Sequence, residues 1–318
     1  MRWEKLGRIF DPRDFALPHG CREFAQAPQA LVCDGFVRIY FSTRSVDAEG
    51  GKFRSHVAYV DMKRDFSAAL GASAHTVVPL GAPGAFDEHG IFPMNVVRDG
   101  ARVLGYTSGV NRRVSVPVDS AIGLAVSDDG GRSFRKDGDG PVLGPALHEP
   151  CLVADPFVLR HEDLFHMWYI FGTPWRLYPG QAAPERLYRI AHASSRDGRE
   201  WSRAGRWIVE PALGPTECQA LPTVAAIGGR FHMFFCFREA TDFRTGAGRG
   251  YRIGHAVSDD LARWTRDDAT LPLAGSVGEW DSDMQCYPHV FHCDGEVFML
   301  YNGNAFGRHG FGLARLVG

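Results

Sequence analysis

The sequence predicts an all-β protein, a five-bladed β-propeller, and two periodic features support this prediction. A proline followed by apolar residues recurs at intervals of 65, 63, 66 and 66 residues, as Pro28, Pro93, Pro156, Pro222 and Pro288. Eight to ten residues after each proline, a second apolar run follows that is rich in aromatic and β-branched residues. Repeats of this kind, with several short strands in each, are typical of propeller blades.

The strands of each repeat can be placed one after another. The second runs begin at Val37, Val103, Leu164, Phe231 and Val297. In four repeats the link before this run contains Asp-Gly or Gly-Gly, which is a hairpin signal. A third run closes each repeat, at residues 55–61, 121–127, 189–195, 252–258 and 311–316. Each blade is therefore expected to contain three to four antiparallel strands.

The ends of the chain are expected to close the ring. The strand at residues 311–316 needs an outer neighbour, and the strand-like residues 3–10 are expected to supply it. Residues 11–29 and 65–74 are the only candidates for short helical turns. Neither segment shows sustained helical periodicity, so no longer helix is expected there. No change of composition marks a linker, so residues 1–318 are expected to form a single domain.

Composition and charge exclude several classes of protein. Hydrophobic residues make up 45% and charged residues 23% of the chain, as in a soluble globular protein. A net charge of −2 gives no electrostatic reason to expect nucleic acid or a membrane as a partner. No apolar run could span a bilayer, and residues 1–10 lack the apolar centre of a secretion signal. We therefore expect a cytoplasmic protein.

Carboxylates recur at fixed distances from the repeated prolines. Acidic residues stand five positions before four prolines and one position before Pro156, namely Glu23, Glu88, Glu217, Asp283 and Asp155. Both positions are expected to face the central channel, because alternate residues of a strand share a face. Asp87, Glu149 and Asp281 lie close by in sequence. Such neighbouring carboxylates shift one another's pKa, and pairs with different pKa values are what cleavage of a glycosidic bond requires.

Residues that follow the second strands are expected to reach the same end of the channel. Aromatic, amide and cationic side chains suit the alternating apolar and hydroxyl-bearing faces of a sugar ring. The candidate substrate-binding residues are Glu23, Arg44, His89, Trp175, Arg176, Arg238, Trp280, Asp281, Gln285, His289, Asn302 and Asn304. The histidines do not have zinc-site spacing, so no metal or cofactor is expected; a central structural calcium or sodium ion is left open.

Several of these motifs resemble a known superfamily over nearly the whole chain. Asp155-Pro156, Thr216-Glu217-Cys218, GEWDSDMQCYPHVF and YNGNAFGRHGFG resemble the five-bladed propeller glycoside hydrolases of families 43, 32, 68 and 130. The resemblance implies that Asp155 orients the substrate and that Glu217 is the proton donor. It leaves Asp87, Glu88 or Asp283 for the remaining acid, because Ala27 stands where the first-blade aspartate of families 43 and 32 is found.

The resemblance leaves the reaction open. A glycosidase or transglycosidase would need a replacement for the missing aspartate. A phosphorylase like those of family 130 would use phosphate as its nucleophile and a basic cluster, for which the candidates are Arg44, Arg176, Arg238, His289 and Arg308. A non-catalytic sugar-binding propeller and a scaffold for another protein are the remaining alternatives. The YNGN-type ending also resembles propellers of surface-polysaccharide clusters, which implies a carbohydrate or an activated or lipid-linked sugar as ligand.

Overall fold

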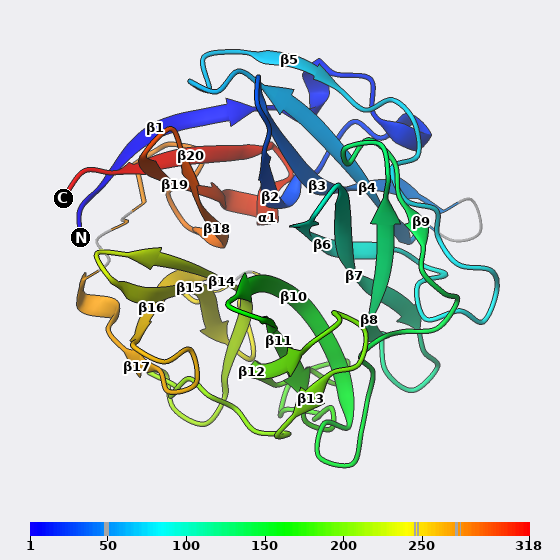
Figure 1. Ribbon diagram of the computed structural model, residues 1–318. Helices are drawn as coiled ribbons and strands as arrows, with labels where there is room; N and C mark the ends of the chain where they lie inside the picture. Colours follow the sequence, from blue (N-terminus) through cyan, green and yellow to red (C-terminus); the bar gives the residue numbers. More distant parts are fainter. Residues whose placement is uncertain (48–50, 245, 247, 271–272, 274) are drawn as a thin grey trace.

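Five four-stranded antiparallel sheets form a ring in the computed structural model (Figure 1). The structure describes residues 1–47, 51–244, 246, 248–270, 273 and 275–318. Each sheet is a blade whose first strand in sequence, for blades 1–4, is also the innermost strand (Figure 1). The predicted five-bladed β-propeller is therefore confirmed.

The blades follow one another along the chain. Blade 1 contains β2 (Gln26–Val32), β3 (Val37–Val46), β4 (Phe53–Met62) and β5 (Ala69–Ala72). Blade 2 contains β6 (Ile91–Asp99), β7 (Arg102–Arg112), β8 (Val118–Ser127) and β9 (Arg135–Lys136). Blade 3 contains β10 (Cys151–His161), β11 (Leu164–Gly172), β12 (Tyr188–Ser195) and β13 (Ser202–Arg203). Blade 4 contains β14 (Glu217–Ile227), β15 (Arg230–Glu239), β16 (Arg252–Ser258) and β17 (Thr265–Arg266). Blade 5 contains β18 (Cys286–Cys293), β19 (Glu296–Asn302), β20 (Phe311–Leu316) and, outermost, β1 (Trp3–Phe10).

The amino-terminal strand closes the ring, as expected. β1 pairs with β20 in antiparallel fashion, from Trp3 opposite Leu316 to Phe10 opposite Phe311. Asn302 adds a second link between the last and first blades. Its Oδ1 accepts a hydrogen bond of 2.8 Å from the amide of Ala27.

Short helical turns occur in only one of the two segments expected to contain them. Residues 11–29 include the 3₁₀ turns Pro12–Asp14 and Pro18–Gly20. The expectation was wrong for residues 65–74, where Ala69–Ala72 form β5 on the open edge of β4. Two other short helical segments are Asp268–Thr270 and α1 (Asn304–Gly307).

The hydrophobic core lies between neighbouring blades. Five buried clusters fill the spaces between blades 1 and 2, 2 and 3, 3 and 4, 4 and 5, and 5 and 1. Burial of apolar side chains between sheets therefore holds each blade against the next. This packing leaves the axis of the ring for polar side chains and for the site.

A bulge interrupts the innermost strand of every blade at its proline. In blade 3, Ala154 lies opposite Ile170 and Phe157 lies opposite Trp168, so one extra residue is inserted between them. Equivalent insertions occur in the other four blades. In four blades the residue before the proline is left-handed, with φ between 48° and 57°: Ala27, Asp155, Leu221 and Tyr287. A bulge changes the direction in which its side chains point. The expectation that the residues one and five positions before each proline lie on the same face of the strand is therefore wrong.

Candidate active site

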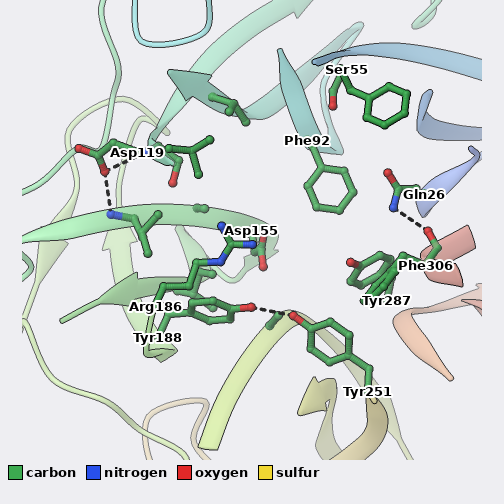
Figure 2. Close-up of a pocket in the computed structure, with 18 of the residues that line it drawn as sticks. Gln26, Ser55, Phe92, Asp119, Asp155, Arg186, Tyr188, Tyr251, Tyr287 and Phe306 are labelled. Carbon is green, nitrogen blue, oxygen red and sulfur yellow. Dashed lines mark hydrogen bonds between the residues drawn. The ribbon is translucent and has the colours of Figure 1, made fainter. Parts of the chain in front are cut away.

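A pocket opens at the end of the ring where the innermost strands begin and the second strands end. Its volume is about 370 Å³, which is within the usual range for a small-ligand site. The bulge residues Phe92, Asp155 and Tyr287 line it, from blades 2, 3 and 5 (Figure 2). The repeated proline thus marks the position from which the chain points side chains into the pocket.

Asp155 is a buried carboxyl group at the wall of this pocket. Its side chain accepts a hydrogen bond of 3.2 Å from the amide of Leu221, and its own amide donates one of 2.7 Å to Ser108 Oγ. Burial raises the pKa of Asp155 to about 7, although the Leu221 N–H and the charge of Arg186 act in the opposite direction. The carboxyl group can therefore give or take a proton near neutral pH, as a general acid or base requires.

Arginines supply most of the charge in the pocket. The five that line it are Arg44, Arg112, Arg186, Arg238 and Arg244. Arg112 is neutralised by Asp47, whose Oδ2 lies 2.7 Å from its Nη1. Arg244 has a longer contact of 3.7 Å with Glu185. Within the described part of the chain, no carboxylate lies at ion-pair distance from Arg44, Arg186 or Arg238.

Arg238 lies behind a pair of tyrosines. Its side chain is fully buried, and its Nη2 donates a hydrogen bond of 2.8 Å to the hydroxyl of Tyr188. That hydroxyl lies 2.7 Å from the hydroxyl of Tyr251 (Figure 2). The guanidinium also lies 3.5 Å from the centre of the Phe243 ring, a cation–π contact. This network holds a positive charge in the pocket wall.

Arg44 lies on the opposite side, at the end of β3. Its guanidinium is 4.8 Å from the ring centre of Phe24 and 5.6 Å from that of Phe53. Burial lowers the pKa of Arg44, and the charges of Arg244 and Arg186 lower it further. The pocket therefore brings like charges together from blade 1, from the β11–β12 loop and from blade 4.

Asp119 is the second carboxylate that lines the pocket. Its Oδ1 accepts hydrogen bonds of 3.0 Å from the amide of Leu152 and 2.9 Å from that of Ser120. Its Oδ2 lies 3.2 Å from Arg113. Both oxygens of Asp119 are thus engaged by donors of the protein itself.

Four of the residues predicted from the sequence line the pocket: Asp155, Arg44, His89 and Arg238. His89 lies at the rim, where its Nδ1 accepts a hydrogen bond of 3.3 Å from the amide of Arg112. The expectation that residues at the ends of the second strands reach this end of the channel is confirmed for Arg44 and Arg238.

Three of the predicted acids instead form buried ion pairs with the outermost strand of their own blade. Asp87 lies 2.5 Å from Lys136 on β9, Glu217 lies 2.6 Å from Arg266 on β17, and Asp281 lies 2.5 Å from Lys5 on β1. Glu149 of blade 3 repeats the pattern with Arg203 on β13, at 2.5 Å. These carboxylates are at most 1% exposed and do not line the pocket. The placement of Glu217, Asp87 and Asp281 at the channel mouth was wrong.

The other predicted acids also lie outside the pocket. Glu88 contacts His89 with 3.1 Å between Oε1 and Nε2 and bonds the amide of Gly84. Asp283 is exposed. Glu23 forms an ion pair of 2.9 Å with Arg308 across the junction of blades 1 and 5. Their expected positions relied on the strand alternation that the bulges interrupt.

The remaining predicted binding residues do not line the pocket. The Asn302 amide bonds Ala27 and Ala25, and Asn304 Oδ1 accepts hydrogen bonds from the amides of Asp283 and Met284. Trp280 packs 5.2 Å from Tyr301, and Gln285 donates a hydrogen bond to the carbonyl of Asp281. Trp175 and Arg176 lie in the β11–β12 loop without lining the pocket. His289 lies between Phe157 and Phe291, and burial lowers its pKa to about 3.

Several residues of the pocket were missed by the comparison of repeats. They are Gln26, Asp119, Arg112, Arg186, Tyr188, Arg244, Tyr251 and Tyr287, together with Phe24, Phe53, Phe92, Phe243 and Phe306. Gln26 donates a hydrogen bond of 2.6 Å to the carbonyl of Phe306 (Figure 2). The position directly before the proline was the available signal for Phe92 and Tyr287.

Neither a metal-binding cluster nor a membrane-spanning helix occurs among the described residues. No group of three or more of their His, Cys, Asp or Glu side chains could hold a metal ion. No described helix is long and apolar enough to cross a membrane.

The fold is shared with carbohydrate-active enzymes of known structure. A complex of BT0996 with RGII superimposes with a TM-score of 0.71 at 16% identity, over 99% of this protein and 91% of that one. The β-1,2-mannobiose phosphorylase from Listeria innocua gives 0.69 at 13% identity, over 99% and 97%. The GH43_1 enzyme from Xanthomonas citri complexed with xylose gives 0.64 at 17% identity, over 98% and 90%. The resemblance to the five-bladed propeller glycoside hydrolases is thereby confirmed at the level of the fold.

Sequence comparison places the protein more closely. No protein-family model matches it. The proteins named "Uncharacterized protein MT1551" and "Uncharacterized protein Rv1502", from two strains of Mycobacterium tuberculosis, are each 33% identical to it over 320 residues. The alignment covers 99% of this protein and 99% of each relative. The protein therefore belongs to the same family as Rv1502 and MT1551, a family whose fold here is the five-bladed propeller.

Proposed function

We propose that this protein is a carbohydrate-active enzyme that cleaves or transfers a glycosyl unit, with Asp155 as its general acid and base. One observation carries the proposal: a buried carboxyl group with a pKa of about 7 is aimed by a bulge into a small-ligand pocket. The fold shared with glycosidases and a phosphorylase supports a sugar as the substrate.

In this reaction the protonated form of Asp155 donates its proton to the leaving oxygen of the glycosidic bond. The same group, once ionised, accepts a proton from an incoming hydroxyl in the reverse direction. The aromatic rings of Phe92, Tyr251 and Tyr287 give the pocket flat apolar faces on which a sugar ring can pack.

The nucleophile in this proposal comes from a second substrate rather than from the protein. Cleavage with a protein nucleophile or base needs a second free carboxylate facing the first. The other carboxylate of the pocket, Asp119, is bound by two amides and Arg113, and Ala27 provides no acid in blade 1. Transfer to an acceptor that brings its own nucleophilic oxygen therefore fits the pocket better than simple hydrolysis.

The test is a screen of aryl glycosides and sugar 1-phosphates with the wild type and two variants. Asp155→Asn should lower turnover by about 10²–10⁴-fold, as expected for loss of a general acid or base. Asp283→Asn, an exposed acid outside the pocket, should leave turnover unchanged. Full turnover of Asp155→Asn would disprove the proposed role. Glycan binding by calorimetry without product would instead support a non-catalytic sugar-binding propeller.

A further inference from the structure

We infer that Gln26 is a specificity-determining residue, whose side-chain carbonyl accepts a hydrogen bond from one hydroxyl group of the bound sugar. The inference deepens the proposed function and rests on it for the identity of the ligand as a sugar. It concerns the wall of the pocket that blade 1 supplies, where the described lining residues include no carboxylate.

Gln26 occupies a position that is apolar in the other four blades. Two residues before the repeated proline, blades 2 to 5 carry Ile91, Ala154, Ala220 and Cys286. A polar side chain at such a position needs hydrogen-bonding partners, because burial of an unpaired amide is costly. Gln26 is only 1% exposed, so bulk solvent does not supply these partners.

The protein fixes one end of the Gln26 amide. Its Nε2 donates a hydrogen bond of 2.6 Å to the carbonyl of Phe306 in α1. Since the nitrogen of this amide is a donor and the oxygen an acceptor, the bond decides which of the two faces away from Phe306. Figure 2 shows the oxygen on the other side of the amide, toward the space beside Phe92. Gln26 therefore presents an acceptor to the pocket.

This acceptor has no donor from the protein. The Oε1 atom is buried, and no donor among the described residues bonds to it. The other buried side-chain atoms without partners on the described lining residues are the Nε atoms of Arg44 and Arg238, which are donors. Buried polar atoms normally have a partner. We therefore expect the ligand to bring a donor to Oε1.

A neutral hydroxyl group suits this position. A carboxylate or phosphate oxygen is itself an acceptor, so it would repel Oε1. The ring of Phe92 is partly exposed in the pocket near Gln26, and its centre lies 5.6 Å from that of Tyr287 (Figure 2). A sugar that packs on such a ring projects hydroxyl groups from its edge, where a few placed polar groups can fix its orientation. One of these hydroxyls would donate to Oε1.

Calorimetry with deoxy sugars tests the contact. The probes are the methyl glycosides of D-mannose, D-glucose, D-galactose and D-xylose, each with its monodeoxy analogues. For the parent that binds best, one analogue should bind the wild type about tenfold to hundredfold more weakly, because it cannot donate to Oε1. Equal binding of the parent and all its analogues, or no binding of any parent, overturns the inference.

Two substitutions of Gln26 separate this contact from a structural role. Gln26→Ala should bind the parent and that analogue with equal affinity, since the acceptor is gone. Gln26→Glu at pH 5 should keep the discrimination. Burial favours a protonated carboxyl group, which retains a donor for the Phe306 carbonyl and an acceptor for the hydroxyl. Urea unfolding of each variant verifies that it is folded.

Gln29→Ala is the matched control. Gln29 lies on the same strand, is 4% exposed and accepts a hydrogen bond of 2.9 Å from Asn95, but it does not line the pocket. Its loss should lower stability without changing the ratio of the two affinities. If Gln26→Ala also left that ratio unchanged, Gln26 would serve only to hold Phe306, and the inference would be overturned.

The outcomes also separate this inference from the proposed function. Discrimination that disappears in Gln26→Ala, without turnover of any glycoside, would support the hydroxyl contact and contradict the enzymatic proposal. Turnover that depends on Asp155, with the same discrimination in the wild type and in Gln26→Ala, would contradict the role of Gln26 alone.

Discussion

The carboxylate of Glu217 lies 2.6 Å from the guanidinium of Arg266, and the pair is buried between the first and last strands of blade 4. Glu217 also accepts hydrogen bonds from the amides of Ala212 and Leu213, at 2.8 and 2.9 Å. The residue that resembles the acid of related propellers is therefore held by donors of the protein itself and does not line the pocket.

We predict that Glu217→Gln destabilises the protein without removing its chemistry. Among the described residues, Arg266 then keeps only its ion pair of 2.8 Å with the partly exposed Asp268, so we expect a loss somewhat below the roughly 3–5 kcal/mol that a fully uncompensated buried charge costs. Urea unfolding should show this loss, while turnover at a temperature where the variant is folded stays close to that of the wild type. The double variant Glu217→Leu with Arg266→Met should recover stability, because no buried charge is then left unpaired. A folded Glu217→Gln protein with turnover as low as Asp155→Asn would contradict the prediction.

A second prediction concerns the effect of Asp155 on stability. Its folded pKa of about 7 is above its ordinary value of 3.8. The folded state therefore binds the proton more tightly, so the stabilising contribution is present below pH 3.8 and is lost as the pH rises through 7. Relative to the wild type, Asp155→Asn should therefore become more stable as the pH rises from 3.8 to 7. Above pH 7 the difference in the free energy of unfolding should reach roughly 4 kcal/mol.

Chemical unfolding of both proteins from pH 4 to 9 measures this gain. Asp283→Asn serves as the control, because its carboxylate is exposed, and its stability relative to the wild type should not follow the same curve. A gain for Asp155→Asn that does not vary with pH would show that the raised pKa has no effect on stability.

Asn302 provides a third prediction, on closure of the ring. Its side chain bonds the amide of Ala27 and the carbonyls of Ala25 and Gly310, each at 2.8 Å. Asn302→Ala leaves these buried groups without partners, so we expect a loss of about 2–4 kcal/mol. Asn304→Ala, which removes contacts nearer the surface, should cost less in the same urea titration. Equal losses would mean that Asn302 has no special role in closure.

The sequence predicted the fold because a propeller repeats its pattern. The five prolines and the hairpin turns fall at nearly constant intervals, so each blade supports the assignment of the others. The partner of the last strand was also predictable, since residues 3–10 were the strand-like segment still without a blade. The prolines indicated more than strand positions, because they mark the bulges that direct Phe92, Asp155 and Tyr287 into the pocket.

The acids were misplaced because the segments before the innermost strands differ in length. The equivalent buried acids stand six, seven, five and seven positions before their prolines, at Asp87, Glu149, Glu217 and Asp281. A fixed count of five therefore selected only Glu217 correctly among these. Their partners were visible in the sequence as a basic residue eight or nine positions after the serine that ends the third strand, at Lys136, Arg203 and Arg266.

The set of arginines that line the pocket was only partly predictable. Arg44 and Arg238 stand at equivalent ends of second strands, so comparison of repeats found them. Arg186 and Arg244 lie in the β11–β12 and β15–β16 loops, which are longer than the corresponding loops of blades 1, 2 and 5. Nothing in the repeat pattern could align them, and only folding brings them to the pocket.

The last prediction links anion binding in the arginine-lined pocket to the titration of Asp155. A negative charge bound beside Asp155 raises the pKa of that carboxyl group further, because it disfavours the ionised form. By linkage, an anion binds more tightly while Asp155 is protonated. Sulfate is the suitable probe, since it remains a dianion between pH 5.5 and 8.5. We expect its affinity for the wild type to fall about threefold to tenfold as the pH rises through 7, the pKa of Asp155.

The other groups that face the pocket should not reproduce this dependence. Burial lowers the pKa of His89, and burial raises the pKa of Tyr251 and Tyr287 well above their ordinary value. Sulfate affinity for Asp155→Asn should therefore vary little with pH, while Asp283→Asn should behave like the wild type. If Asp155→Asn retained the full pH dependence, the anion would not lie beside Asp155. Because the coupling acts between the bound anion and one carboxyl group, this comparison tests whether the anion binds beside Asp155.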